Sequence, residues 1–326
     1  NGRRSLRTLT ARAFAQVTGK GAMDLEWLED FLALVDAGHF GRAAEHRHLT
    51  QPAFSRRVKA LEDWAGAALF DRSTHRVGLT AAGEALRPSA EEIVRRLLQS
   101  REEVRRAAGT AAAALRFAAT HALSLTFFPT WLRTLESQAR SAAIHLMSDS
   151  LKACEQAMRQ GQAQFLLCHA HPAVPAHLDP RHFLSAAVGG DVLVPAAAAD
   201  GHGAPLQSLS PLADRPVPVL DYSPDSALGW IVGATVAGAP ASLRTETMLT
   251  ARSAMVLRAM ALNGRGIAWL PLSLIEPDLR AGTLARAGSS DWDAPVEIRL
   301  FRSKARQSPE AERFWTLATR SPNGQP

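Results

Sequence analysis

The chain contains little cysteine, little tyrosine and no long apolar run. Its 326 residues include two cysteines and one tyrosine. Two cysteines are too few for a disulfide scaffold, which favours a reducing compartment. Lysine or arginine interrupts every long hydrophobic stretch, and none approaches the roughly 20 residues that a membrane-spanning helix needs. We therefore expect a cytoplasmic protein without a membrane association.

The usual sequence signatures of enzymes and metal sites are also missing. There is no G-x-S-x-G elbow, phosphate-binding loop, H-E-x-x-H pair or glycine-rich dinucleotide fingerprint. We therefore predict no catalytic residues and no cofactor. Cys168, His169, His171, His177 and His182 lie near one another in sequence, but their spacing matches no standard zinc pattern, and no metal is predicted.

Positive charge is concentrated near the N-terminus. The formal net charge is +6, and residues 1–22 hold five basic side chains and no acidic one. Met23 directly precedes the first predicted helix, so we expect residues 1–22 to be a disordered extension upstream of the natural start. The alternative is a basic arm that touches DNA. A second basic concentration lies between Arg42 and Lys59, where five basic residues accompany one acidic residue.

Residues 23–87 have the periodicity of three short helices. Apolar residues from Leu25 to Val35 recur at helical spacing, and a second short helix follows from Phe40. The third helix begins after Thr50, a suitable N-cap, with Pro52 in its first turn, where the missing N–H costs nothing. Its predicted buried stripe consists of Phe54, Val58 and Leu61.

The opposite face of this third helix has the chemistry of a DNA-reading surface. Gln and Arg can bond to purine edges in the major groove, while Ser and Lys can hold phosphates. An amphipathic helix with an Arg-Arg pair would by itself indicate only a solvated surface. Here, however, two short strands around a basic tip follow it, as in a winged helix-turn-helix. The predicted DNA contacts are Gln51, Pro52, Ala53, Ser55, Arg56, Lys59, Arg72 and Arg76.

This region resembles the N-terminal DNA-binding domain, or head, of the LysR-type transcriptional regulators. The similarity is carried by residues 40–44, 49–62, 69–72 and 79–83. Two departures are Gly41, where the family usually has Ser, and the turn His46-Arg47-His48. The resemblance implies a regulator that binds double-stranded promoter DNA as a homodimer or homotetramer, and a sensor domain similar to periplasmic binding proteins that takes a small-molecule effector.

Residues 88–110 are predicted to form a linker helix and hinge. Pro88-Ser89 is a suitable start signal, and apolar residues recur in steps of three and four. Charged residues flank this seam, as a two-chain coiled coil requires. We expect dimerisation through Val94, Leu97 and Val104, and the alternative is a helix packed on its own head domain.

Residues 111–326 alternate between predicted strands and helices, which is typical of an α/β fold. We expect two lobes with parallel sheets, joined by crossovers near residues 185–195 and 284–296. Lobe 1 would contain residues 115–188 and 294–320, and lobe 2 residues 189–293. The cleft between them is the expected ligand site. The predicted strands are 115–119, 144–147, 165–168, 217–221, 243–245, 266–270 and 296–301, and the predicted helices are 123–137, 151–160, 227–237, 251–263 and 309–318.

Several polar residues are expected to face this cleft. Thr120, His121 and Ser124 follow the first strand, where hydroxyls and free N–H groups could hold a carboxylate or another small anion. Ordinary helix capping by Thr120 or Ser124 is the alternative. Lobe 2 would close the same pocket. The remaining predicted effector contacts are His169, Tyr222, Ser223 and Trp269.

Parts of the sensor resemble the hypochlorite-responsive subgroup of LysR-type regulators. The matching segments are residues 119–125, 221–223, 266–271 and 311–315. This resemblance implies an oxidant signal read by methionine, with Met147 and Met248 as candidates. One departure weakens it, because Leu228 stands where a close relative would have Met. A Cys154–Cys168 redox pair remains an alternative.

The sequence as a whole predicts a transcriptional regulator rather than an enzyme. A cytoplasmic solute-binding protein or an enzyme built on the two-lobed domain is the rival interpretation. That rival interpretation gives no role to the predicted DNA-binding region, residues 23–87.

Overall fold

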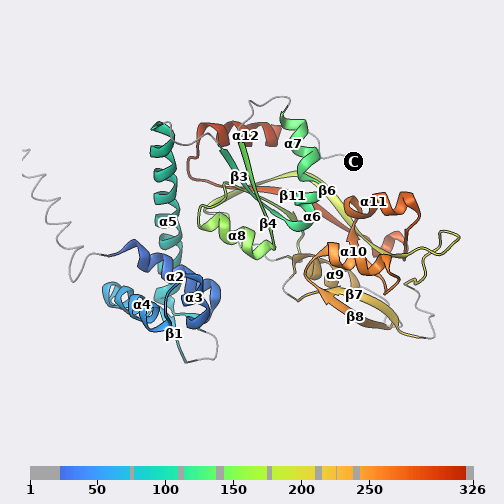
Figure 1. Cartoon of the computed structure of the whole chain (residues 1–326), viewed down its shortest axis with the longest axis horizontal. Coiled ribbons are helices and arrows are strands. Elements are labelled where there is room, and N and C mark those ends of the chain that lie inside the picture. Colours follow the sequence, from blue (N-terminus) through green and yellow to red (C-terminus); the bar gives the residue numbers. More distant parts are fainter. Residues whose placement is uncertain are drawn as a thin grey trace, which may run out of the picture. The chain divides into compact units, whose positions relative to one another are not determined.

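The chain divides into two compact units between Ser100 and Arg101 (Figure 1). We call them the head and the sensor and describe each by itself. The predicted extension 1–22 and Arg76 lie outside the described residues. The computed structural model describes residues 23–73, 77–108, 114–136, 143–174, 178–209, 215–224, 226–237 and 243–320.

The head contains the predicted three helices and small hairpin. Phe31, Phe54, Val58 and Leu61 are fully buried between the helices, so the predicted apolar stripe of the third helix faces the core. That helix ends at Gly66, whose φ of 70° suits a residue without a side chain. The elements are α2 Leu25–Ala37, α3 Phe40–His46, α4 Gln51–Ala65, β1 Phe70–Asp71 and β2 Gly78–Leu79.

The linker helix begins earlier than predicted. Helix α5 spans Ala81–Ala107, so Pro88 lies inside the helix rather than at its start. The start is fixed by Thr80, whose Oγ1 accepts a hydrogen bond from the Gly83 N–H at 3.1 Å. Thr80 also anchors this end to the head, since its hydroxyl donates to the Ala68 carbonyl. The predicted boundary between residues 87 and 88 therefore falls within one continuous helix.

The first half of α5 packs against the head of its own chain. Ala90 and Val94 are buried in the head core, so the structure assigns Val94 to intrachain packing rather than to a dimer seam. Leu97 and Val104 are 49% and 68% exposed, and Ile93 is exposed beside them. Because these three residues follow one another at steps of four and seven, they form a single apolar stripe on the helix.

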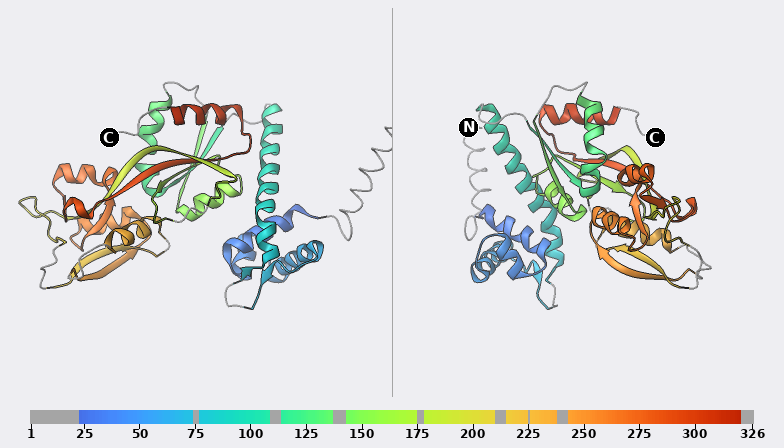
Figure 2. Two further views of the ribbon diagram at one scale, coloured as in Figure 1. Left: turned by 180° about the vertical axis from the view of Figure 1, so that it is seen from behind. Right: turned by 45° about the vertical axis from the view of Figure 1, so that its right-hand side comes forward.

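Two long antiparallel strands run through both lobes of the sensor, β6 Phe183–Ala198 and β11 Ala294–Ser303 (Figure 2, yellow-green and red). In lobe 1, β11 pairs with β5 Phe165–Ala170, followed by β3 Ala114–Thr120 and β4 Ala143–Asp149. In lobe 2, β6 pairs with two short strands, and a parallel pair adjoins one of them through a Val219–Ile267 bridge. These strands are β7 Val217–Tyr222, β8 Thr245–Ala251, β9 Ala268–Pro271 and β10 Leu284–Arg286.

The two-lobed α/β architecture agrees with the prediction, whereas several details differ. The predicted crossover 185–195 lies within β6, whereas 284–296 holds β10, a 3-10 turn and the first residues of β11. The lobe 1 sheet is mixed rather than parallel, and lobe 2 combines antiparallel strands beside β6 with a separate parallel pair, β7 and β8. The predicted helix 123–137 is two helices, α6 His121–Leu125 and α7 Phe128–Glu136. Strand β8 begins where the predicted strand 243–245 ends. Strand β10 and helix α11 Leu272–Ala281 were not predicted.

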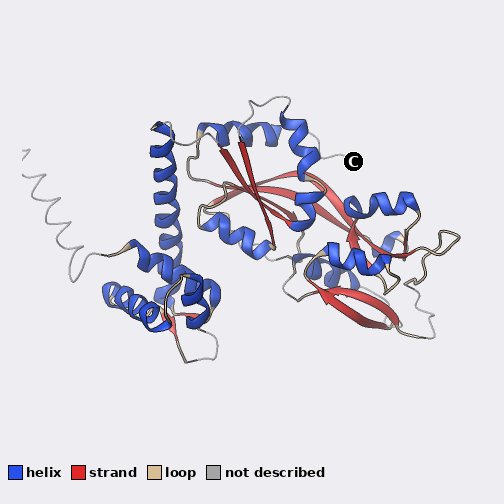
Figure 3. Ribbon diagram, viewed as in Figure 1, coloured by secondary structure: helices blue, strands red, loops and turns tan. Residues whose placement is uncertain are grey.

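Helices cover both faces of the lobe 1 sheet (Figure 3). On one face, α7 and α12 Pro309–Arg320 enclose an aromatic core around Phe117, Phe165 and Phe314. On the other face, α8 Leu151–Arg159 packs over β3, β4 and β5. Lobe 2 has its own core, covered by α9 Ala227–Val236, α10 Ala254–Leu262 and α11.

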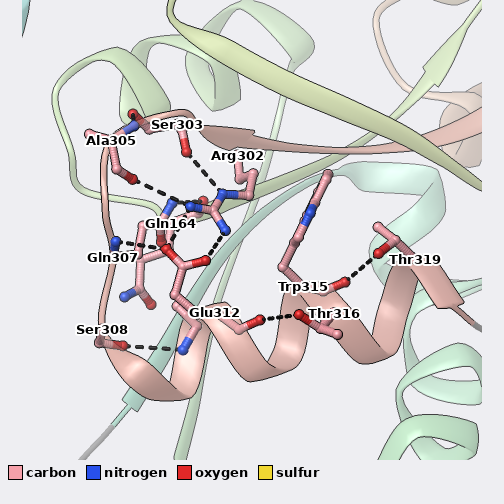
Figure 4. Close-up of polar contacts among 11 residues, drawn as sticks. Gln164, Arg302, Ser303, Ala305, Gln307, Ser308, Glu312, Trp315, Thr316 and Thr319 are labelled. Carbon is pink, nitrogen blue, oxygen red and sulfur yellow. Dashed lines mark hydrogen bonds and ion pairs between the residues drawn. The ribbon is translucent and has the colours of Figure 1, made fainter.

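A buried arginine fastens α12 to the end of β11 (Figure 4). The Arg302 guanidinium donates to both carboxylate oxygens of Glu312, at 2.6 and 2.8 Å, and to the Ser303 carbonyl at 2.9 Å. Its side chain is 5% exposed, compared with 42% for Glu312. The Arg302 hydrogen bonds hold the pKa of Glu312 below its ordinary value, because they stabilise the ionised carboxylate.

We predict that Arg302→Met lowers the free energy of unfolding by about 1–3 kcal/mol, because several hydrogen bonds to a charged group are lost. The deficit should shrink on acidification. A carboxylate with a lowered folded pKa stabilises the fold above its unfolded pKa, and this contribution is lost as pH falls through the folded value. Urea unfolding at pH 7 and pH 3.5 measures both effects.

The matched control is Arg313→Met, which removes an exposed ion pair with Glu310 on the same helix. Exposed pairs contribute at most about 1 kcal/mol, so this variant should unfold almost like the wild type. Equal losses in the two variants would refute an anchoring role for Arg302.

Candidate nucleic-acid interface and interlobe pocket

The predicted reading face of α4 is open to solvent. Gln51, Pro52, Arg56 and Lys59 are exposed, and Ala53 and Ser55 are half-buried. Lys59 forms an exposed ion pair with Asp63 one turn later. The N-terminal end of the helix thus presents an amide, a hydroxyl and a guanidinium together, which is the chemistry that major-groove readout requires.

The two arginines of the Arg-Arg pair have different roles in the head. Arg57 contacts Asp30 of α2 at 2.6 Å and Glu26 at 2.5 Å, whereas Arg56 is exposed. Arg47, in the turn before α4, bonds to the same Asp30 at 2.8 Å. Desolvation raises the pKa of the fully buried Asp30 and outweighs the opposing effects of Arg47 and Arg57. These ion pairs fix α4 against α2, so two members of the basic concentration are structural.

Arg72 is held beside the hairpin by a buried carboxylate. Its Nη2 donates to Glu62 Oε2 at 3.0 Å, and its guanidinium lies over the Phe40 ring. Glu62 Oε1 also accepts from the Leu69 N–H at 3.0 Å. Arg72 remains about half exposed, with its position set by both contacts. It can therefore face a phosphate without losing its fixed orientation.

A pocket of about 70 Å³ lies between the two lobes, at the carboxyl ends of the parallel strands. Lobe 1 contributes the residues that follow β3 and β4, and lobe 2 those that follow β7 and β8. Parallel strands that end at one edge commonly create such a site. Its polar lining residues are Thr120, His121, Asp149, Ser150, His169, Ser226, Arg252 and Ser253.

The electrostatics of this pocket favour a small anion. The N-terminal ends of α8, α9 and α10 reach it through their N-cap residues Ser150, Ser226 and Ser253. Free N–H groups and helix dipoles at such ends attract negative charge. Arg252 adds a cation, while Asp149 is the opposing anion. Among the described residues, the buried Thr120 Oγ1 has no hydrogen-bond partner, so the wall retains an unsatisfied polar atom.

His121 and Ser124 form a hydroxyl network at the lobe 1 side. Ser124 Oγ donates to the His121 carbonyl at 2.8 Å and lies 2.7 Å from Ser148 Oγ. His121 Nδ1 lies 3.2 Å from the same Ser148 hydroxyl. Of these residues, His121 lines the pocket and Ser124 supports it from behind. The alternative interpretation was that Thr120 caps the following helix. The Thr120 side chain makes no capping hydrogen bond to α6, so the structure does not support that role for Thr120.

Three predicted lobe 2 residues lie outside the pocket. Tyr222 is buried in the lobe 2 core, where its hydroxyl donates to the Trp269 carbonyl at 2.9 Å. Desolvation raises the pKa of this phenol strongly. Trp269 is buried beside it and donates to the Trp292 carbonyl. Ser223 donates its N–H to Ala251 and does not line the pocket. The helix-initiating Ser226, Arg252 and Ser253 occupy the expected positions instead.

His169 adjoins a buried cluster where the lobes meet. Its Nε2 lies 3.9 Å from Asp191 Oδ2 on β6. Asp191 also accepts hydrogen bonds from the N–H and the hydroxyl of Ser273, at 3.2 and 2.6 Å, and Ser273 Oγ lies 3.1 Å from Thr126 Oγ1 of lobe 1. Burial opposes ionisation of Asp191, but His169, Ser273 and the Val192 N–H together lower its pKa. This cluster links β5, β6 and α11 across the lobe junction.

The sulfur groups differ in accessibility. Cys154 and Cys168 are free and buried, and desolvation raises the pKa of the Cys154 thiol to about 12. Such thiols hold almost no reactive thiolate near neutral pH. Met248 on β8 is 54% exposed, whereas Met147 is partly buried against the core under α8. Of the predicted redox candidates, Met248 is therefore the more accessible to an oxidant.

No metal or membrane site emerges from the described part of the chain. Within it, no three His, Cys, Asp or Glu side chains lie together as metal ligands. His177, one of the histidines near Cys168, lies outside that part. No described helix combines the length and the apolar character that crossing a bilayer requires.

Comparison with known proteins gives matches to both units. The family model of the bacterial regulatory helix-turn-helix protein of the lysR family matches residues 25–84, and the LysR substrate binding domain matches residues 108–322. The chain is 29% identical over 294 residues to the HTH-type transcriptional regulator YjiE of Escherichia coli strain K12, which covers 90% of this chain and 93% of that protein.

Two solved structures are similar over nearly the whole length. Full-length HypT from Salmonella typhimurium, described as a hypochlorite-specific LysR-type transcriptional regulator, is 28% identical with a TM-score of 0.54 and covers 90% of this chain and 96% of its own. Vibrio fischeri DarR, solved in complex with DNA, is 27% identical with a TM-score of 0.56 and covers 92% and 99%.

The order of the matched domains is that of the head and the sensor. Since the second family model alone spans most of the chain, the assignment does not depend on the helix-turn-helix motif. The chain belongs to the LysR family of transcriptional regulators, with an N-terminal helix-turn-helix DNA-binding domain and a C-terminal effector-binding domain.

Proposed function

We propose that this regulator binds double-stranded promoter DNA as a homodimer and reads bases through the N-terminal half of α4. The main support is the exposure of Gln51 and Arg56 on α4. Arg57 and Arg47 hold this helix in place through their ion pairs with Asp30. A fixed helix presents its side chains to base edges with little loss of conformational freedom on binding. Lys59 and Arg72 would contact phosphates, which fixes the register of the helix without specifying sequence.

Dimerisation would use the apolar stripe on α5. Ile93, Leu97 and Val104 are 46%, 49% and 68% exposed on this helix. An apolar seam at coiled-coil spacing favours a second helix of the same kind. Two heads joined in this way would contact two half-sites, and a further pairing of dimers would give the tetramer that the family resemblance implies.

The effector would be a small anion, such as a short carboxylate, bound in the interlobe pocket. Three helix N-terminal ends, Arg252 and the unpartnered Thr120 hydroxyl supply the positive potential and the donors. A volume of about 70 Å³ admits only a few heavy atoms, so a larger effector would need the lobes to separate. Binding would favour one interlobe arrangement through the donors that it engages from each lobe.

An oxidant signal is the second candidate. The Salmonella structure described as hypochlorite-specific and the exposure of Met248 favour it. Conversion of Met248 to its sulfoxide would make a side chain on β8 polar, three residues before β8 ends and four before Arg252. Met147 lies on the matching strand of lobe 1, next to the α8 core.

We expect Arg56→Ala to weaken binding to the preferred DNA sequence by about 1–3 kcal/mol and to relax the preference at one base position. Arg72→Ala should weaken all sequences alike, because phosphate contacts carry no sequence information. Fluorescence anisotropy at fixed salt, with a selected site and its single-base variants, measures both. A uniform loss across sequences for Arg56→Ala would remove this residue from base readout.

Val104→Glu should shift the protein towards monomer by placing a charge in an apolar helix seam. The mass in solution, measured by light scattering across a concentration series, reports the change. Arg105→Lys is the neighbouring control, since it alters an exposed residue beside Val104 but keeps its charge. An unchanged dimer with Val104→Glu would show that α5 does not carry the interface through this residue.

Acetate should raise the melting temperature of the wild-type protein but not that of Arg252→Met. A ligand at about 100 times its Kd stabilises by about 2.7 kcal/mol, which corresponds to several degrees for a domain of this size. Differential scanning calorimetry with acetate and with the bulkier morpholinoethanesulfonate, at equal ionic strength, measures the effect. Arg265→Met, an exposed lobe 2 variant outside the pocket, should respond like the wild type.

A different pattern would favour the oxidant. In that case acetate has no effect, and the melting temperature shifts only after brief hypochlorite treatment. Methionine sulfoxide reductase reverses the shift, and Met248→Leu abolishes it. Such a result would contradict the anion proposal and replace it with a methionine switch.

A further inference from the structure

A second and larger hollow lies in lobe 1, on the sheet face opposite α7 and α12. Its volume is about 570 Å³, and residues of β5, β6 and β11 line it. Helix α8 packs over β3, β4 and β5 on this face, so the described helices leave the part over β6 and β11 uncovered (Figure 3). The hollow falls within the range of about 300–1,000 Å³ that is typical of small-molecule sites.

The outer wall of the hollow is held by hydrogen bonds. After β5, His171 Nδ1 accepts from the Ala173 N–H at 3.1 Å, and the Val174 N–H donates to the His171 carbonyl at 2.9 Å. Before β6, the Phe183 N–H donates to the Asp179 carbonyl at 3.0 Å. These bonds keep Val174 and Phe183 at the rim of the hollow. These bonds hold the two described parts of the wall, residues 171–174 and 178–183.

One arginine and two carboxylates are among the described residues that line this hollow. Arg299 of β11 contacts Glu297 on the same strand at 2.7 Å and donates to Ser185 Oγ of β6 at 3.2 Å. Glu155 of α8 also lines the hollow; it is buried, and its Oε2 lies 4.0 Å from Nη1 of Arg159 on the same helix. Arg299 pairs with Cys168 of the neighbouring strand β5, and Cys168, Arg299 and Glu155 all line the hollow.

Apart from His169 and His171, most of the remaining lining of the hollow is apolar. Its walls consist largely of the side chains of Leu151, Val174, Leu178, Phe183, Val296 and Phe301. A ligand must therefore combine an apolar body with a polar end that suits both signs of charge. This differs from the interlobe pocket, which is small and surrounded by donors.

We propose that this hollow is a second ligand site, which takes a zwitterion with a large apolar side chain, such as a hydrophobic amino acid. The ligand carboxylate would bind the guanidinium of Arg299, and its ammonium would lie between Glu297 and Glu155. A simple carboxylate that binds Arg299 would leave Glu297 without its cation, and a simple amine that binds Glu297 would leave Arg299 without its anion. The apolar side chain would fill the space between Leu178 and Phe183.

Isothermal titration calorimetry of the full chain with three probes of one shape tests the proposal. L-Phenylalanine carries both charges, hydrocinnamate only the carboxylate, and phenethylamine only the ammonium. We expect L-phenylalanine to bind at least tenfold more tightly than either singly charged probe. L-Leucine and L-methionine extend the series, because a hollow of about 570 Å³ admits apolar side chains of different sizes. Failure of all three amino acids to bind, or equal affinity for hydrocinnamate, would overturn the proposal.

Two variants locate the site. Arg299→Met removes the cation but keeps the aliphatic stem, and it should weaken amino-acid binding at least tenfold. Val174→Trp fills the rim without altering the charged end, and it should weaken binding to a similar degree. A melting curve for each variant verifies folding. Undiminished binding in both folded variants would place the ligand elsewhere and contradict the assignment.

The interlobe variant Arg252→Met provides the matched control. It should retain the wild-type affinity for the amino acid, because Arg252 does not line this hollow. If the wild-type protein binds the amino acid but not acetate, only the proposed effector function is refuted. If Arg252→Met abolishes amino-acid binding, the ligand occupies the interlobe pocket and the second site is refuted.

Discussion

The antiparallel pairing of β6 with β11 is the constraint on which the sensor depends. The two strands remain paired from Phe183 with Ser303 to Leu193 with Ala294, and they therefore belong to both lobes. The register shifts once. Ile298 pairs with Gly189, but the next residue of β11, Arg299, pairs with Ala187. Because a side chain at Gly189 would collide with the Phe127 ring, this residue permits the close approach of lobe 1 at the bend.

This pairing also relates the two cavities of the sensor. The interlobe pocket forms where the parallel strands on each side of the long pair end, whereas the lobe 1 hollow lies over the long pair itself. His169 lines both cavities, and its Nε2 has no hydrogen-bond partner among the described residues. Asp191 stands beside it on β6, bonded to Ser273 of α11. A change in either cavity would therefore reach the same buried cluster, which provides a physical route for coupling.

The head was the most predictable region, because its signals are local. Thr50, Pro52 and the stripe through Phe54 and Val58 specify α4 within a few residues. The sensor was harder to predict, because its decisive contacts join distant segments. Strand β8 has mostly exposed side chains, so alternation is weak and the sequence gives little sign of where it ends. The pocket residues Arg252 and Ser253 follow that strand and were therefore missed. Tyr222 was misplaced because its partner, the Trp269 carbonyl, lies 47 residues away.

If the anion that we propose between the lobes controls DNA binding, it must change the arrangement of the two DNA-reading heads in the dimer. The most direct test is the distance between spin labels at Asp63→Cys, an exposed position on α4, in the dimer. The native cysteines are buried and should remain unlabelled. Pulsed electron resonance should show different distance distributions in saturating acetate and in morpholinoethanesulfonate, and this difference should vanish in Arg252→Met. Identical distributions in wild-type protein that binds acetate would contradict the account.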